Sequence, residues 1–148
     1  RQMCIRDSIV GCLKVGMEVS VACPEGYDPH PDVLAFAREA GHGFSLVRDP
    51  LEAAAGVDVV FTDVWASMGQ EEEAAQRRAA FRGYQVNEAL MAVTDPSCMV
   101  QHCLPAHRGE EITAEVFEAH AGEIFDEAEN RLHAQKAVLC LLMGEDAR

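Results

Sequence analysis

The feature that most constrains this sequence is the alternation of short apolar segments with helical segments along its length. Strands are predicted at residues 17–22, 44–47, 57–62, 99–104 and 123–125, with helices between them. Such alternation is typical of an α/β domain whose mainly parallel sheet is covered by helices on both faces. We therefore predict a three-layer, Rossmann-like sandwich, and 148 residues suffice for one such domain with a buried core.

The predicted helices carry the residue types that commonly begin and end helices. They are placed at residues 9–15, 32–40, 50–55, 72–81, 87–93, 113–119 and 128–143. Gly16, Gly41 and Gly56 follow three of them, as C-terminal glycines often do, and Asp32 and Asn87 are predicted N-caps.

The charge balance excludes several classes of partner. Twelve Lys and Arg residues against 25 Asp and Glu residues give a net charge of -13, which repels phosphate backbones and anionic lipid headgroups. No apolar run approaches the ~20 residues that span a bilayer, and the first residues lack the pattern of a secretory signal. We predict a cytoplasmic protein that binds neither nucleic acid nor membrane.

The six cysteines show neither a CxxC pair nor the dense, regular spacing of a disulfide scaffold, so they are predicted to be thiols. His102, Cys103 and His107 offer three metal-binding atoms within six positions. Structural zinc sites draw four ligands in paired short spacings, and no second pair is present. We predict no metal ion.

Asp63 follows the most apolar predicted strand, at the strand end where parallel sheets bind ligands. Its carboxylate can bind an ammonium group, Ser67 can donate and accept a hydrogen bond, and Gly69 permits close approach of the backbone. The alternative is that Asp63 only caps a turn or a helix. The spacing of the residues leaves both interpretations open.

His102 and Cys103 come at the end of the next predicted strand. A thiol in this place can contact an amine, orient it or accept its proton. The alternative is a buried structural cysteine, which is the commoner role of an unpaired thiol. A Cys-His nucleophile has less support, because nothing indicates a pocket for an acyl substrate.

Arg131 lies at the predicted start of the last helix, after the short strand at 123–125. Helix N-termini favour anions, so Arg131 is a candidate for binding a phosphate or carbamoyl oxygen. The alternative is that Arg131 pairs with Glu127 or Glu129 on a solvated face.

Four segments together resemble ornithine carbamoyltransferases, in the order and at the separations of that family. They are residues 63–73 (Asp-Val-Trp-Ala-Ser-Met-Gly-Gln-Glu-Glu-Glu), 83–86 (Gly-Tyr-Gln-Val), 102–105 (His-Cys-Leu-Pro) and 127–131 (Glu-Ala-Glu-Asn-Arg). The resemblance covers nearly the whole chain from about Ser8, including residues 24–27 and 49–54.

The resemblance implies transfer of the carbamoyl group from carbamoyl phosphate to the δ-amine of L-ornithine, without metal or organic cofactor, and Cys103 as the catalytic residue. Asp63, Ser67 and Met68 are implied to hold the amino-acid part of ornithine, and Cys103 is implied to lie beside the reacting side-chain amine. Implied carbamoyl phosphate contacts are Cys103, Leu104 and Arg131, with His102 and Pro105 as supporting residues. Members of this family assemble as homotrimers or larger oligomers.

Two departures from the family pattern limit what the resemblance implies. The family's amino-terminal domain, with its Ser-Thr-Arg-Thr-Arg phosphate-binding stretch, has no counterpart here. Residues 1–7 look foreign to the family, so we predict an artefactual or disordered leader followed by an ornithine-binding domain at 8–148. We therefore expect the isolated chain to be inactive.

Two other functions stay open. A sister carbamoyltransferase acting on putrescine or an acylated ornithine shares the architecture, although residues 67–69 together with His102 and Cys103 favour ornithine itself. The chain could also be a non-catalytic module that binds an amino acid. A nicotinamide-binding domain is disfavoured because no GxGxxG follows a first strand.

Overall fold

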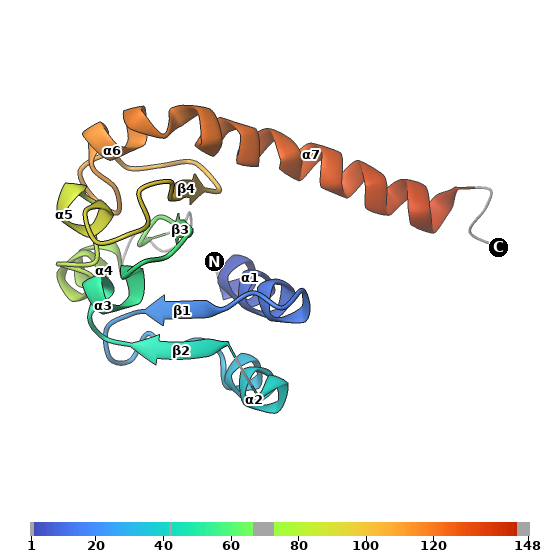
Figure 1. Cartoon of the computed structure of the whole chain (residues 1–148), viewed down its shortest axis with the longest axis horizontal. Coiled ribbons are helices and arrows are strands. Elements are labelled where there is room, and N and C mark those ends of the chain that lie inside the picture. Colours follow the sequence, from blue (N-terminus) through green and yellow to red (C-terminus); the bar gives the residue numbers. More distant parts are fainter. Residues whose placement is uncertain (1, 42, 67–72, 145–148) are drawn as a thin grey trace.

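The computed structural model describes residues 2–41, 43–66 and 73–144. Figure 1 shows helices and strands alternating along the chain, and the α/β class is confirmed. In chain order the elements are α1 (Gln2–Lys14), β1 (Val19–Ala22), α2 (Pro31–Ala40), β2 (Phe44–Val47), α3 (Pro50–Ala54), β3 (Val59–Thr62), α4 (Ala74–Ala80), α5 (Glu88–Met91), β4 (Met99–His102), α6 (Ala114–Ala119) and α7 (Ala121–Met143).

The strands pair in parallel, as the alternation predicted. β1 pairs with β2 from Val19 beside Phe44, and β3 pairs with β4 up to Thr62 beside His102. Parallel neighbours need a crossover between them, and helices supply it in both pairs. Among the described residues the strands form two two-stranded sheets rather than one continuous sheet. Helix α3 links the two pairs, since it packs against β1, β2 and α5.

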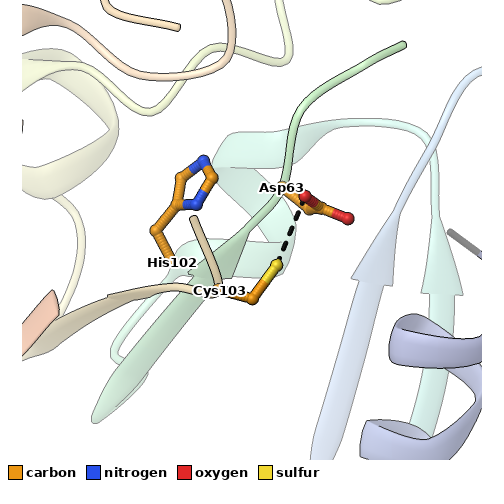
Figure 2. A group of neighbouring side chains, drawn as sticks. All are labelled: Asp63, His102 and Cys103. Atoms are coloured by element: carbon orange, nitrogen blue, oxygen red, sulfur yellow. Dashed lines mark hydrogen bonds between the residues drawn. The ribbon is translucent and has the colours of Figure 1, made fainter. Parts of the chain in front are cut away.

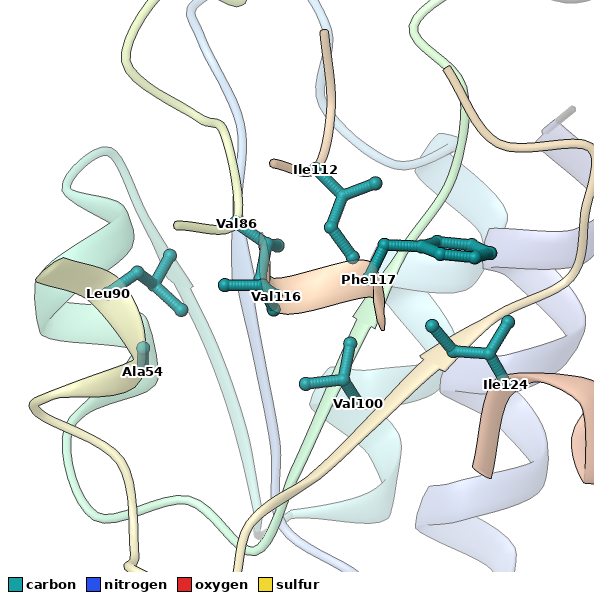
Figure 3. Packing of buried hydrophobic residues seen from close by; sticks show 8 residues of the cluster. All are labelled: Ala54, Val86, Leu90, Val100, Ile112, Val116, Phe117 and Ile124. Atoms are coloured by element: carbon teal, nitrogen blue, oxygen red, sulfur yellow. The ribbon is translucent and has the colours of Figure 1, made fainter. Parts of the chain in front are cut away.

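Two apolar clusters match the two strand pairs. One joins α1 and α2 through Ile9, Leu13, Val33 and Ala37. The other surrounds β4, and Figure 3 shows its side chains converging from separate segments. Its buried members are Ala54, Val86, Leu90, Val100, Ile112, Val116, Phe117 and Ile124. The second cluster fixes the carboxyl ends of β3 and β4, where the predicted site lies.

Local capping follows the sequence with one correction. Asn87 caps α5, because its Oδ1 accepts a hydrogen bond from the Leu90 backbone N–H at 3.0 Å. The prediction that Asp32 caps α2 is wrong. The cap is His30, whose Nδ1 accepts a hydrogen bond from the Asp32 backbone N–H at 3.3 Å. The reason is Pro31, whose fixed φ and missing N–H suit the first helical position, so the cap lies two residues before Asp32.

The predicted strand at 123–125 is wrong, because α7 already begins at Ala121. Ile124 is fully buried in the second cluster while Phe125 is exposed, which fits one face of a helix as well as it fits a strand. No turn residue separates Phe125 from the helix-forming residues that follow. A three-residue pattern is too short to distinguish the two structures.

Helix α7 is attached to the domain by its first turns. Ile124 packs in the second cluster, whereas residues 129–144 are exposed, including Leu132, Val138 and Leu139. Figure 1 shows this helix extending beyond the rest of the fold. Within the described parts of the chain, no helix combines the length and the apolar character needed to cross a membrane.

The beginning of the chain differs from the expected disordered leader. Residues 2–7 form the first part of α1, which continues without a break to Lys14. A disordered leader therefore does not fit the backbone of residues 2–7, and an artefactual leader stays a prediction. Helix α4 begins at Ala74, and residue 72, where it was predicted to begin, lies outside the described residues.

Candidate active site at the ends of strands β3 and β4

Asp63 and Cys103 are brought together by the register of β3 and β4. Thr62 and His102 are paired at the carboxyl ends of these strands, so the residues that follow them emerge side by side. The Cys103 thiol lies 3.4 Å from Oδ1 of Asp63, to which it donates (Figure 2). The same oxygen accepts the Val64 backbone N–H at 2.8 Å. Asp63 therefore both caps its own turn and contacts the thiol, so the two interpretations left open by the sequence are compatible.

The segment after Asp63 is anchored by aromatic side chains. Trp65 is buried and stacks on Phe81 with ring centroids 6.1 Å apart. Phe81 in turn makes edge contacts with Tyr27 and Tyr84. The predicted ornithine contacts Ser67 and Met68 lie outside the described residues. The aromatic cluster thus anchors Trp65, two residues after Asp63.

His102 is completely buried and lies beside Cys103 at the end of β4 (Figure 2). Its Nδ1 accepts the Leu104 backbone N–H at 2.9 Å, and its Nε2 lies 3.0 Å from Oε1 of the equally buried Glu111. Because Nδ1 acts as an acceptor, the imidazole is neutral and carries its proton on Nε2, which donates to Glu111. Sequence reasoning named His102 as a supporting residue but missed Glu111.

Leu104 and Pro105 continue the turn after β4. Leu104 has a φ of 54°, in a region that residues other than glycine rarely adopt, and its N–H is held by His102. Its side chain packs against the second cluster, while Pro105 is exposed. The conformation of this turn therefore depends on the buried imidazole.

Glu127 approaches the same turn from α7. Its Oε2 is buried with no hydrogen-bond partner among the described residues. Burial raises the pKa of the Glu127 carboxyl, and the charge of Asp63 adds to the rise, whereas His102 and Arg131 act to lower it. Glu127 is thus a further residue of the site, and only its position in the 127–131 motif indicated it.

Arg131 does not lie at a helix N-terminus, which corrects the sequence prediction. It is exposed in the middle of α7, because the helix begins ten residues earlier than Arg131 at Ala121. The helix-dipole argument therefore fails, since that effect is confined to the first turn. Arg131 is connected to the site electrostatically, through its influence on Glu127.

Asp63, His102 and Cys103 also form a group whose potential metal-binding atoms lie within 4.8 Å of one another. Both ring nitrogens of His102 already have partners, and the Cys103 thiol donates to Asp63. The three side chains therefore satisfy one another by hydrogen bonding, and a metal ion would have to break these bonds.

The buried Glu111 gives stability a dependence on pH. Burial opposes its ionisation, but hydrogen bonds from His102 and from the His107 backbone N–H outweigh this, and the pKa of Glu111 falls below its ordinary value of 4.5. A lowered pKa stabilises the fold above about pH 4.5, and this contribution is lost as the pH falls through the folded-state pKa. In Glu111→Gln the acceptor remains and the charge is lost. We expect this variant to be about 1–3 kcal/mol less stable than the parent at pH 7.

The measurement is urea unfolding of both proteins between pH 7 and pH 3. The difference in free energy of unfolding should shrink below pH 4.5, because the parent carboxylate becomes protonated. Glu110→Gln is the matched control, since Glu110 forms an ion pair with the half-exposed Arg78. A difference that stays constant over the whole range would contradict the assignment of a charged Glu111.

The fold is that of an α/β domain with parallel strands, and such domains bind ligands beyond the carboxyl ends of their strands. A carboxylate and a thiol lie at that place in this chain. The model of the aspartate/ornithine carbamoyltransferase Asp/Orn-binding domain matches residues 2–142. The chain belongs to this family, and the resemblance stated from its motifs is confirmed.

Relatives named ornithine carbamoyltransferase match most of the chain. That of Synechococcus is 54% identical over 139 residues, covering 92% of this chain and 46% of the relative. The crystal structure of the anabolic enzyme of Campylobacter jejuni has a TM-score of 0.90 at 38% identity, covering 97% of this chain and 48% of that one. The chain spans about half the length of the curated relatives it matches.

A solved N-acetyl-L-ornithine transcarbamylase is also similar. Its TM-score is 0.78 at 29% identity, and the match covers 94% of this chain and 44% of that one. The fold is therefore common to enzymes named for different substrates.

Proposed function

We propose that this chain is the ornithine-binding half of an ornithine carbamoyltransferase, which forms L-citrulline and phosphate. The observation that carries the proposal is the contact between the Cys103 thiol and the Asp63 carboxylate at adjacent strand ends. The 54% identity to a relative named ornithine carbamoyltransferase supports ornithine as the substrate.

The reaction requires removal of a proton from ornithine. The side-chain ammonium resembles that of lysine, with a pKa of about 10.4, and is not nucleophilic. Asp63 attracts the cation, and Cys103 sulfur accepts its proton while the thiol proton passes to Oδ1 of Asp63. The freed amine forms a bond to the carbamoyl carbon, the bond from that carbon to the phosphate oxygen breaks, and the second nitrogen proton leaves with phosphate.

Ser67 and Met68 complete the ornithine contacts in this proposal, and Cys103, Leu104 and Arg131 contact carbamoyl phosphate. The preceding half of a full-length enzyme would supply most of the carbamoyl phosphate site, so the domain at 8–148 is inactive alone. The assembled enzyme is a homotrimer or larger oligomer in the cytoplasm. It uses no metal or organic cofactor, because proton transfer and orientation of two small substrates suffice.

The proposal can be tested with a fusion of this chain to the amino-terminal half of the Synechococcus relative, called the joined protein below. We expect kcat/KM for ornithine to exceed those for putrescine and N-acetyl-L-ornithine by at least about 100-fold. The isolated chain, assayed in parallel, should form no citrulline. Equal or faster carbamoylation of putrescine or N-acetyl-L-ornithine would exclude ornithine as the substrate.

The acylated-ornithine alternative rests on the similar transcarbamylase structure, at the lower identity of 29%. The comparison of kcat/KM for ornithine and N-acetyl-L-ornithine in the joined protein decides between the two substrates. A non-catalytic binding module predicts that calorimetry detects ornithine binding while the joined protein forms no product.

A further inference from the structure

Two carboxylates from segments distant in sequence lie close to the turn that carries Cys103. Glu111, from the segment before α6, accepts a hydrogen bond from the His102 imidazole, and Glu127, on α7, is near enough for His102 to lower the pKa of its carboxyl. His102 and Glu111 are both fully buried. This much buried polarity in one turn calls for a role beyond packing, because apolar residues could fill the same volume.

We propose that Glu111 is a positioning residue: it fixes the His102 tautomer so that Nδ1 can hold the Leu104 N–H, and thereby directs the intervening Cys103 thiol at Asp63. The positioning of the Cys103 thiol does not depend on which reaction the protein catalyses. Only the expected effect on catalysis rests on the proposed function. The chain of contacts runs from Glu111 Oε1 through Nε2 and Nδ1 of His102 to the Leu104 N–H.

The need for an acceptor at position 111 follows from the donors around it. Oε1 of Glu111 also accepts the His107 backbone N–H at 2.6 Å, so this oxygen is held in place facing Nε2. Without it, the Nε2 proton has no acceptor, and only the Leu104 N–H still disfavours the tautomer that carries its proton on Nδ1. That proton would face the Leu104 N–H, donor against donor, and the bond that holds the turn would be lost.

Loss of this bond would act directly on Cys103. Leu104 has a positive φ of 54°, which the bond to His102 helps to maintain. Cys103 lies between these two residues, so a change of φ at Leu104 moves its backbone. The thiol then shifts relative to Asp63, and displacements of about 1 Å at a reacting group can lower rates by about 100-fold.

The first test uses the unmodified chain. Two-dimensional ¹H–¹⁵N spectra of the histidine rings should show His102 with its proton on Nε2 and an unprotonated Nδ1 across neutral pH. A proton on Nδ1, or a charged imidazole, would overturn the proposal. This measurement requires neither a variant nor catalytic activity.

The second test compares Glu111→Gln, which keeps an acceptor oxygen, with Glu111→Met, which has none. Glu111→Met should lower kcat of the joined protein about 10- to 100-fold per folded molecule, with a smaller change in KM. It should also change the rate at which iodoacetamide alkylates Cys103 in the isolated chain, measured by mass spectrometry of that peptide. Glu111→Gln should restore both values to within about threefold of the parent.

Glu123→Met is the matched control. Like Glu111, Glu123 binds one backbone N–H and one histidine: it accepts the Val100 N–H at 2.9 Å and lies 3.0 Å from Nδ1 of His120. Val100 is three residues before Cys103 on β4. This control should lower stability and leave kcat and the Cys103 alkylation rate unchanged. The positioning role would be contradicted if folded Glu111→Met kept the kcat and the Cys103 alkylation rate of the parent. It would also be contradicted if Glu123→Met lost as much of both as Glu111→Met.

The outcomes separate the two proposals. If the unsubstituted joined protein makes no citrulline, the proposed function fails, while ring spectra and alkylation still decide the positioning role. If Glu111→Met does not fold, Glu111→Gln decides: the Nε2-protonated ring and parental alkylation support the proposal, and a changed tautomer overturns it.

Discussion

Cys103→Ser in the joined protein is expected to lower kcat for citrulline formation by about 10²- to 10⁴-fold. Serine keeps a hydrogen-bond donor for Asp63 but is a far weaker proton acceptor than a thiol-thiolate group. Binding of ornithine depends on charge rather than on sulfur, so KM should change less than kcat. Steady-state citrulline assays with both substrates varied give the two constants separately.

Cys98→Ser is the control for this variant, at the opposite end of β4. Cys98 is buried, and its thiol donates to the Met99 carbonyl oxygen, a bond that serine can keep. Its kcat should remain within a few-fold of the parent. A Cys103→Ser protein as active as the parent would remove Cys103 from the proton-transfer step.

Asp63→Asn should raise KM for ornithine by about 10- to 100-fold, because a hydrogen bond to a charged group contributes about 1.5–3 kcal/mol. It should also lower kcat, since Oδ1 can no longer take the proton passed by Cys103. The loss in kcat/KM is therefore expected to exceed that in either constant. KM for carbamoyl phosphate should change little.

The control is Asp58→Asn, at the amino end of the same strand. Asp58 is exposed and lies just before the start of β3, at the end opposite to the site, so both kinetic constants should match those of the parent. An unchanged KM for ornithine in Asp63→Asn would show that another group binds the ammonium.

Much of the local structure could be predicted because short-range rules govern it. Asn87 and Thr113 cap their helices through side-chain oxygens, as N-cap residues do. The closeness of Asp63 and Cys103 followed from the rule that parallel strands end at one edge of a sheet. The failures occurred where a pattern was short: the three residues at 123–125 could not distinguish a strand from the start of α7.

The sequence by itself determined the α/β class, the family, and two of the side chains that meet at the strand ends, because strand periodicity and motif spacing are local properties. Only the tertiary structure decided that Glu111 and Glu127 bracket His102 and that Arg131 lies mid-helix. The buried polar contact in this turn joins residues nine positions apart, and no periodic pattern encodes such pairs. Burial then selects them, because a polar group removed from water must find a partner within the fold.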